Sequence, residues 1–233
     1  MLEGKFRLLE NDFALGAPIN ALFEYSNTGP QTISFAIGNG RDDGFRFVAP
    51  SAGVKELNPY YEFGGLAEII TLEPGMKGSK EILLNRYIQF IEPGEFQIGC
   101  EFDAEVTDEL LTQQIAREEI RDTIHLNVYE DRGRLDNVIA AIERDVREGD
   151  RPARLRAMET LSELRVEAAV HILAHGLSSE DEALAEIAIA GLGNLGSAEA
   201  AEALRSFIAS STSASLRQKA LQELQKISPD SGS

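Results

Sequence analysis

Ala188-Ile189-Ala190-Gly191-Leu192-Gly193-Asn194-Leu195 is the middle member of three similar stretches in this chain of 233 residues. The first stretch is Ala157-Met158-Glu159-Thr160-Leu161-Ser162-Glu163-Leu164, and the third is Ala220-Leu221-Gln222-Glu223-Leu224-Gln225-Lys226-Ile227. The copies begin 31 and 32 residues apart, at Ala157, Ala188 and Ala220. A repeat of this length predicts stacked helix pairs, because one pair alone is too small to bury its apolar face.

Apolar residues at helical spacing surround these copies. Leu135, Ile139, Ile142 and Val146 mark one face of a helix that ends near Gly149. A proline at 152 follows, where a new helix can begin because its first N–H groups need no partner. We expect further helices over residues 153–164, 166–177, 180–195, 198–209 and 214–227.

The residues at equivalent positions of the three copies carry a family resemblance. They are Arg154, Ala157, Leu161 and Leu164; Leu184, Ala188, Leu192, Leu195 and Gly196; and Leu216, Arg217, Ala220, Leu224 and Ile227. This arrangement resembles HEAT-type repeats, and the resemblance implies an α-solenoid whose second helices line a concave surface. Ala185 departs from the pattern, since the other copies have arginine there. Gly196 is expected to end its helix in a left-handed conformation, and Gly191 and Gly193 are expected to allow close helix packing.

The first half of the chain has a period of two instead. Apolar side chains alternate with other residues over 19–25, 33–37, 45–47, 96–102 and 124–128, which predicts β-strands. Pro74-Gly75 and Pro93-Gly94 each place proline and glycine where a type II turn needs them. Strands at this spacing, with no amphipathic helices between them, predict an antiparallel β-sandwich. Cys100 falls on the apolar face of its strand and is expected to be a buried small side chain rather than a nucleophile.

Two segments of the first half resemble a known class of domain. Residues 9–19 read Leu-Glu-Asn-Asp-Phe-Ala-Leu-Gly-Ala-Pro-Ile, and residues 23–29 read Phe-Glu-Tyr-Ser-Asn-Thr-Gly. They resemble the opening strands of bacterial immunoglobulin-like domains, and residues 72–75 and 93–98 resemble later parts of the same domains. The aromatic residue after the second Pro-Gly pair is Phe96, where that family often has tyrosine.

Two further stretches are open to two interpretations. Tyr60 and Tyr61 lie in a loop with Pro59 and Phe63, where they could either bind a partner or close the end of the sandwich. Residues 107–121 have Leu110, Leu111 and Ile115 at helical spacing but run directly into the last strand. They could form a helix or one arm of a long hairpin.

Charge restricts the kinds of partner. The net charge is −17; residues 1–130 hold 10 Lys and Arg against 22 Asp and Glu, and residues 131–233 hold 12 against 17. Nucleic-acid binding requires a basic surface, so we expect no nucleic-acid partner. No apolar run reaches the roughly 20 residues of a membrane-spanning helix, and the first residues lack the apolar core of a signal peptide. We therefore expect a cytoplasmic protein without membrane insertion, or an exported one whose leader is absent from this sequence.

Catalytic and metal-binding patterns are scarce. His171 and His175 are four residues apart on one predicted helix, which is a spacing that some metal sites use, but no cysteine or carboxylate motif accompanies them. The neighbouring residues Ala169, Ile172 and Leu173 occupy the core-facing positions, so both histidines are expected to point outward. No nucleophile elbow, phosphate-binding loop or dinucleotide fingerprint is present in the sequence. We expect no enzyme activity, no metal and no cofactor.

These observations predict an immunoglobulin-like β-sandwich over residues 1–131, HEAT-like helical repeats over 132–228 and a polar tail over 229–233. The predicted function is that of a protein-binding adaptor or scaffold that uses the helical surface together with the sandwich. The predicted contact residues are His171, His175, Glu202, Arg205, Tyr60 and Tyr61. The alternatives are an exported or cell-surface module that binds protein or glycan, and a proteinase inhibitor, since some bacterial sandwiches of this kind have that role.

Overall fold

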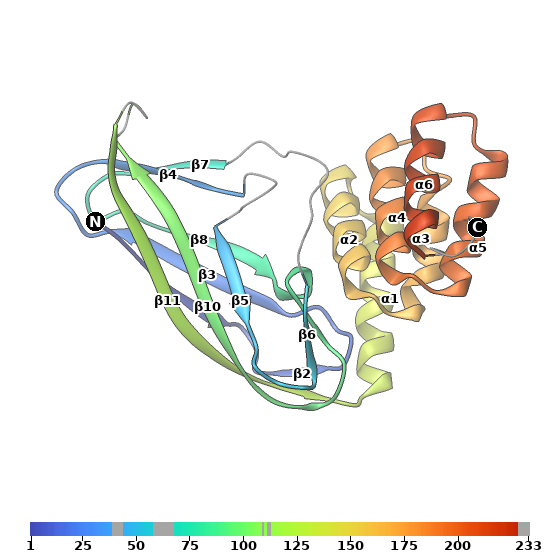
Figure 1. The fold of residues 1–233 in the computed structure, drawn as a ribbon, viewed down its shortest axis with the longest axis horizontal. Coiled ribbons are helices and arrows are strands. Elements are labelled where there is room, and N and C mark those ends of the chain that lie inside the picture. Colours follow the sequence, from blue (N-terminus) through green and yellow to red (C-terminus); the bar gives the residue numbers. More distant parts are fainter. Residues whose placement is uncertain (39–43, 58–67, 109, 111–112, 228–233) are drawn as a thin grey trace. The chain divides into compact units, whose positions relative to one another are not determined.

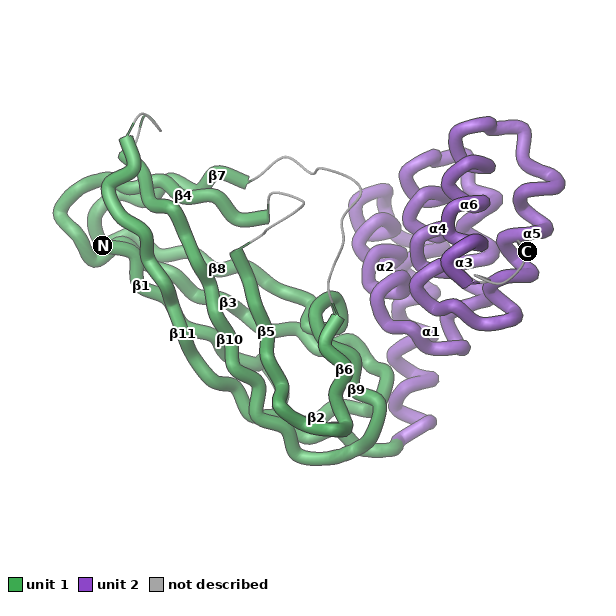
Figure 2. The backbone as a smooth tube through the Cα atoms, viewed as in Figure 1, with its two compact units in different colours: residues 1–130 green, residues 131–233 purple. Residues whose placement is uncertain are grey.

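The computed structural model describes residues 1–38, 44–57, 68–108, 110 and 113–227. The backbone forms two compact units, Met1–Glu130 and Asp131–Ser233 (Figures 1 and 2). The first unit is rich in strands, and the second unit consists of helices. Among the described residues, no helix combines the length and apolar character needed to cross a membrane. Tyr60, Tyr61 and the predicted polar tail lie outside the described residues.

Two sheets supply most of the strands of the first unit. A three-stranded sheet has the order β1-β3-β8, and a larger sheet has the order β2-β11-β10-β4-β7, with β5 paired to β10. β6 and β9 form a separate pair. The strands are β1 (Leu2–Leu8), β2 (Asp12–Ala14), β3 (Asn20–Asn27), β4 (Ile33–Ile37), β5 (Phe45–Val48), β6 (Val54–Glu56), β7 (Glu68–Leu72), β8 (Lys77–Leu83), β9 (Ile88–Phe90), β10 (Gly94–Thr107) and β11 (Gln114–Tyr129), with a 3₁₀ turn at Leu84–Arg86.

β10 and β11 form a long antiparallel hairpin, and within the ambiguous stretch 107–121 the strands include Thr107 and residues 114–121. The register pairs Gly94 with Val128 at one end and Thr107 with Gln114 at the other. Of the two interpretations of this stretch, the hairpin arm is therefore confirmed and the helix is wrong. Leu110 is 77% exposed and Ile115 is 44% exposed, so the helical spacing of these residues does not reflect a buried face.

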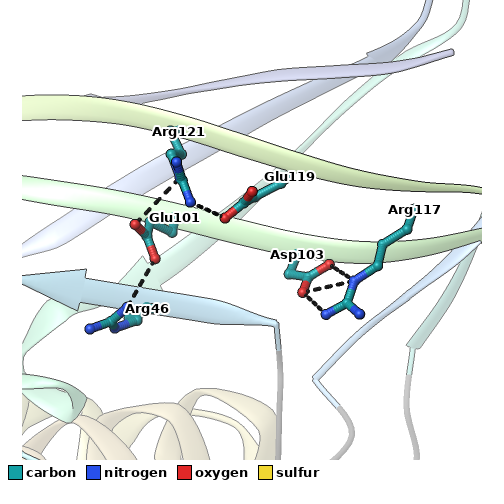
Figure 3. Close-up of polar contacts among 6 residues, drawn as sticks. All are labelled: Arg46, Glu101, Asp103, Arg117, Glu119 and Arg121. Carbon is teal, nitrogen blue, oxygen red and sulfur yellow. Dashed lines mark hydrogen bonds and ion pairs between the residues drawn. The ribbon is translucent and has the colours of Figure 1, made fainter.

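Complementary charges follow the exposed side of this hairpin (Figure 3). Glu101 lies between two guanidinium groups, 3.4 Å from Arg46 on β5 and 3.5 Å from Arg121 on β11. Arg117 forms a two-pronged ion pair with Asp103 across the strands, and its guanidinium lowers the pKa of Asp103 below its usual range. Exposed pairs of this kind contribute little stability each. The register places Asp103 opposite Glu119, and the ion pairs of Asp103 with Arg117 and of Glu119 with Arg121 offset this like-charge contact.

One strand pair departs from the predicted antiparallel arrangement. β2 pairs with the end of β11 in parallel, with Asn127, Val128 and Tyr129 opposite residues 12–14. The Asn127 N–H donates to the Asn11 carbonyl at 2.7 Å, and the Leu15 N–H donates to the Tyr129 carbonyl at 2.9 Å. The short strand thus gives hydrogen-bond partners to an edge of β11 that would otherwise have none in the sheet. The prediction of an antiparallel arrangement is therefore wrong for β2.

Aromatic rings from both sheets share one core. The ring centroid of Phe102 on β10 lies 4.8 Å from that of Phe23 on β3 and 4.6 Å from that of Phe45 on β5. Phe6 on β1 lies 4.8 Å from Phe23 on the neighbouring strand. The alternating apolar residues predicted the buried faces of β3, β4, β5, β10 and β11 correctly. Cys100 is buried in the same core, as predicted, and burial raises the pKa of its thiol to about 12.

The two Pro-Gly turns have different outcomes. Gly75 has φ +79°, and the Met76 N–H donates to the Glu73 carbonyl at 3.0 Å, as a type II turn requires. Gly94 has no positive φ and is the first residue of β10. The second prediction of a type II turn is therefore wrong, because the chain is already extended at Gly94 where that turn needs a left-handed residue.

The second unit contains helices at the six expected positions. They are α1 (Arg132–Glu148), α2 (Arg151–Leu164), α3 (Val170–Gly176), α4 (Glu182–Leu195), α5 (Ala198–Ser210) and α6 (Ala214–Ile227). α3 is shorter than predicted, because residues 167–169 form a 3₁₀ turn ahead of it. The side chains of Asp131, Asp150, Asp181 and Ser197 each accept a hydrogen bond from a backbone N–H of the first turn of the helix that follows.

The first helices of successive pairs pack on one another, α2 on α4 and α4 on α6, while α3 packs on α4 and α5. Gly191 permits the close approach of α4 to α2 and α3, because a Cβ at this position would lie 2.8 Å from the Ser162 Cβ and 2.9 Å from Leu173 Cδ2. Gly196 ends α4 at φ +68°, as predicted. Arg165 ends α2 at φ +54°, a left-handed conformation that glycine adopts without strain but arginine does not.

Candidate functional site

The four described candidates lie on the second helices of the pairs. His171 and His175 are on α3, Glu202 and Arg205 are on α5, and all four are exposed. The outward direction predicted for the two histidines is therefore confirmed. α3 and α5 pack against each other, so the two sets of side chains belong to neighbouring helices of one unit.

Glu202 and Arg205 pair with each other. Arg205 Nη1 lies 3.3 Å from Glu202 Oε2, and the side chains are 52% and 76% exposed respectively. An ion pair so open to solvent has a small net energy, so either charge can change partner at low cost. The pair thus presents one positive and one negative group on the surface of α5.

His171 faces a carboxylate on a different helix. Its Nε2 lies 3.6 Å from Glu143 Oε1 on α1, and Arg147 Nη2 lies 2.5 Å from the same oxygen. Glu143 is only 24% exposed, whereas His171 and Arg147 are about 60% exposed. Sequence reasoning missed Glu143 and Arg147. Their spacing of four residues on a predicted helix is the signal that could have identified them as a pair, but nothing local connects them with His171.

His175 lines a pocket of about 340 Å³ together with Arg147 from α1 and Arg154 from α2. Sequence reasoning treated Arg154 only as a position of the repeat and did not connect it with the histidine. In this pocket a predicted contact residue meets two basic side chains of other helices. In the described part of the chain, no group of three or more His, Cys, Asp or Glu side chains could hold a metal ion.

An ion pair next to this pocket joins the starts of two helix pairs. Arg151 Nε at the start of α2 donates to Asp181 Oδ2 at 2.6 Å, and Nη2 donates to Oδ1 at 3.2 Å. The hydrogen bonds from Arg151 lower the pKa of Asp181 below its usual range. Asp181 also accepts from the Ala183 N–H at 3.2 Å and so caps α4. Asp181 is therefore occupied by partners of its own.

Comparison with known proteins supports the repeat pattern. Residues 137–225 match the family model for HEAT repeats, which covers α2 to α5 and most of α1 and α6. No curated protein matches the chain. The match does not extend to the strand-rich unit, whose resemblance to immunoglobulin-like domains stays a prediction. The helical unit is thus similar to HEAT repeats.

Proposed function

We propose that this chain is a non-enzymatic adaptor or scaffold that binds another protein through its helical unit together with the strand-rich unit. The observation that carries the proposal is the match of residues 137–225 to HEAT repeats, which are commonly protein-interaction scaffolds. Stacked helix pairs provide an extended surface on which many side chains are available for contacts.

The polar side chains at the surface of α1, α3 and α5 are the part of that surface best suited to a partner. They combine both signs of charge, with Arg147 and Arg205 near Glu143 and Glu202, and they include His171 and His175. Mixed charges favour one orientation of a polar partner, because a wrong orientation brings like charges together. Tyr60 and Tyr61 belong to the proposal as contact residues of the strand-rich unit.

A protein partner is favoured over a nucleic acid. Residues 131–233 carry a net charge of −5, with 12 Lys and Arg against 17 Asp and Glu, and residues 1–130 are more acidic still. A phosphate backbone would be repelled by this overall charge. Local arginines can still contact single acidic side chains of a protein.

The test is affinity capture from a native lysate with the full chain as bait, followed by quantitative mass spectrometry. We expect His171→Ala combined with His175→Ala to lower the recovery of the specific partner by about tenfold, which corresponds to a combined loss of about 1.4 kcal/mol for the two contact residues. The melting temperature should change by no more than about 2 °C, because neither side chain is buried.

The matched control is Gln218→Ala combined with Gln222→Ala, an exposed pair with the same spacing on α6. This variant should capture as much partner as the unchanged protein. Equal losses in both variants would contradict the assignment to α3. A large drop in melting temperature in the histidine variant would show that these residues are structural.

A further inference from the structure

We propose that the pocket beside His175 binds a small oxyanion group, a carboxylate or a phosphate. The pocket has a volume of about 340 Å³ and is formed by the end of α1, by α2, by the end of α3 with the residues after it, and by the start of α4. This volume falls in the lower part of the range of small-ligand sites. The inference stands apart from the adaptor proposal, because an anion can bind here whether it is free or part of a protein.

Arg154 provides the main argument. Its side chain lines the pocket from α2, and its Nε has less than 1 Å² of accessible surface and no hydrogen-bond partner among the described residues. A buried N–H without an acceptor is costly, and more so when it belongs to a charged group. An anion in the pocket would supply a compensating charge for the guanidinium of Arg154, which lines the pocket.

Four other polar side chains line the same pocket. Arg147 and His175 bring a second guanidinium and an imidazole, and Ser178 and Ser179 bring hydroxyl groups. Ser179 Oγ already accepts from the Asp181 N–H at 3.1 Å, so its hydroxyl hydrogen is directed elsewhere. The lining thus offers several donors, which is the composition expected for an oxyanion rather than a cation.

Buried apolar side chains also line the pocket. They are Val146, Met158 and Leu184, and a Cβ on Gly176 would lie 2.6 Å from Met158 Cε. Apolar neighbours lower the local dielectric, so the attraction of the basic groups for an anion is stronger than it would be beside polar neighbours alone.

The nearby acidic side chains have basic partners of their own. Glu143 is paired with Arg147 at 2.5 Å, and Asp181 is held by Arg151 through two hydrogen bonds. Asp181 interacts with Arg154 only through a weaker long-range attraction. The charge of Arg154 therefore remains available to a ligand in an otherwise acidic protein.

The experiment follows the arginine Nε–Hε signals of the ¹⁵N-labelled full chain by NMR during titration with inorganic phosphate or with acetate. Sodium chloride keeps the ionic strength constant. We expect the Arg154 signal to shift and to saturate with at least one anion, and the anion that saturates identifies the class of ligand. Linear shifts without saturation for both anions would overturn the proposal.

Variants separate this site from general charge attraction. Arg154→Gln should weaken the binding by about tenfold or more, as expected when a charge-assisted hydrogen bond is lost. Arg156→Gln removes an exposed arginine of the same helix that does not line this pocket, and it should leave the affinity unchanged. Equal weakening in both variants would contradict the assignment.

If Arg154→Gln does not fold, His175→Gln combined with Ser178→Ala provides the second test. Both side chains are exposed, so the fold should be retained. A several-fold loss of affinity is expected, and unchanged affinity would overturn the proposed pocket. None of these outcomes depends on capture of a protein partner, so the adaptor proposal is tested separately.

Discussion

The two units are stabilised by cores of opposite composition. All five tyrosines and ten of the eleven phenylalanines lie in residues 1–130, and Phe207 is the one aromatic residue among Phe, Tyr and Trp in residues 131–233. The first core is built from rings that meet across two sheets, such as Phe23 and Phe102 at 4.8 Å. The second is built largely from alanine and leucine, with Gly191 at a helix contact.

This difference shows two ways in which sequence determines packing. Large rings fill the space between sheets, and their contacts join residues that are far apart in the chain. Small residues let helices approach each other, and they recur at a fixed interval because each helix pair repeats the same contact. We therefore expect truncation to damage the first unit most and enlargement to damage the second.

The largest effect is expected from Phe102→Ala. Phe102 is fully buried and lies within 6.1 Å of the rings of Phe23, Phe35 and Phe45. Its truncation should lower the free energy of unfolding of the first unit by about 3–5 kcal/mol, because it removes apolar contacts and leaves a cavity. Urea titration followed by tyrosine fluorescence measures this unit alone, since every tyrosine lies in it and the chain has no tryptophan.

The circular dichroism at 222 nm provides the internal control, because most of the helical signal comes from the second unit. The midpoint at this wavelength should stay close to that of the unchanged protein. An equal shift of both signals would contradict the idea of two separately packed cores.

A smaller effect of opposite origin is expected from Gly191→Ala. The added methyl group would approach the Ser162 Cβ to 2.8 Å and the Ser162 Cα to 2.9 Å, so α2 and α4 must separate. We expect a loss of about 1–2 kcal/mol, since overpacking costs more than the improved helix propensity provides. The measurement is the urea midpoint of the 222 nm signal.

Gly133→Ala is the matched control for this change. Gly133 is in the first turn of α1, and among the described residues a Cβ there meets nothing closer than the Asp131 Oδ1 at 3.6 Å. The change should leave stability unchanged or raise it slightly, because alanine has the better helix propensity and meets no obstruction. If both alanines stabilised the protein, close packing at Gly191 would not be the constraint.

The smallest effect concerns the ends of two equivalent helices. Arg165 ends α2 at φ +54°, where Gly196 ends α4 at φ +68°. Arg165→Gly should raise stability by less than about 1 kcal/mol: it removes backbone strain but also loses the bond from Arg165 Nη1 to the Glu163 carbonyl at 2.8 Å. Thermal unfolding at 222 nm measures the change, and Gly196→Ala should lower the midpoint. A gain in the second variant would contradict the strain argument.

Periodic features of the sequence predicted the elements well. The repeat at Ala157, Ala188 and Ala220 located the stacked helices, and alternation located strands such as β3 and β10. Gly196 was predicted as a left-handed helix end, because glycine is the residue that adopts this conformation without strain. These signals can be recognised along the chain without knowing which distant residues come into contact.

Other features depend on distances that no local pattern expresses. The hairpin arm within residues 107–121 depends on the pairing of β11 with β10, whose register the sequence does not display. The contact of Glu143 with His171 joins two helices, as does the pocket shared by Arg154 and His175. The sequence therefore pointed to His171, His175, Glu202 and Arg205 but not to the residues of other helices that lie beside the histidines.

The parallel pairing of β2 with β11 has a consequence for synthesis on the ribosome. Residues 12–14 find their partners only at residues 127–129, so the first unit cannot complete its larger sheet until almost all of its chain has emerged. The helices of the second unit pair with neighbours close in sequence, such as α4 with α5, and can fold pair by pair as they appear. More of the chain must therefore be synthesised before the larger sheet of the first unit is complete than before a helix pair of the second unit is complete. During this time the phenylalanine-rich strands of the first unit are exposed to chaperones.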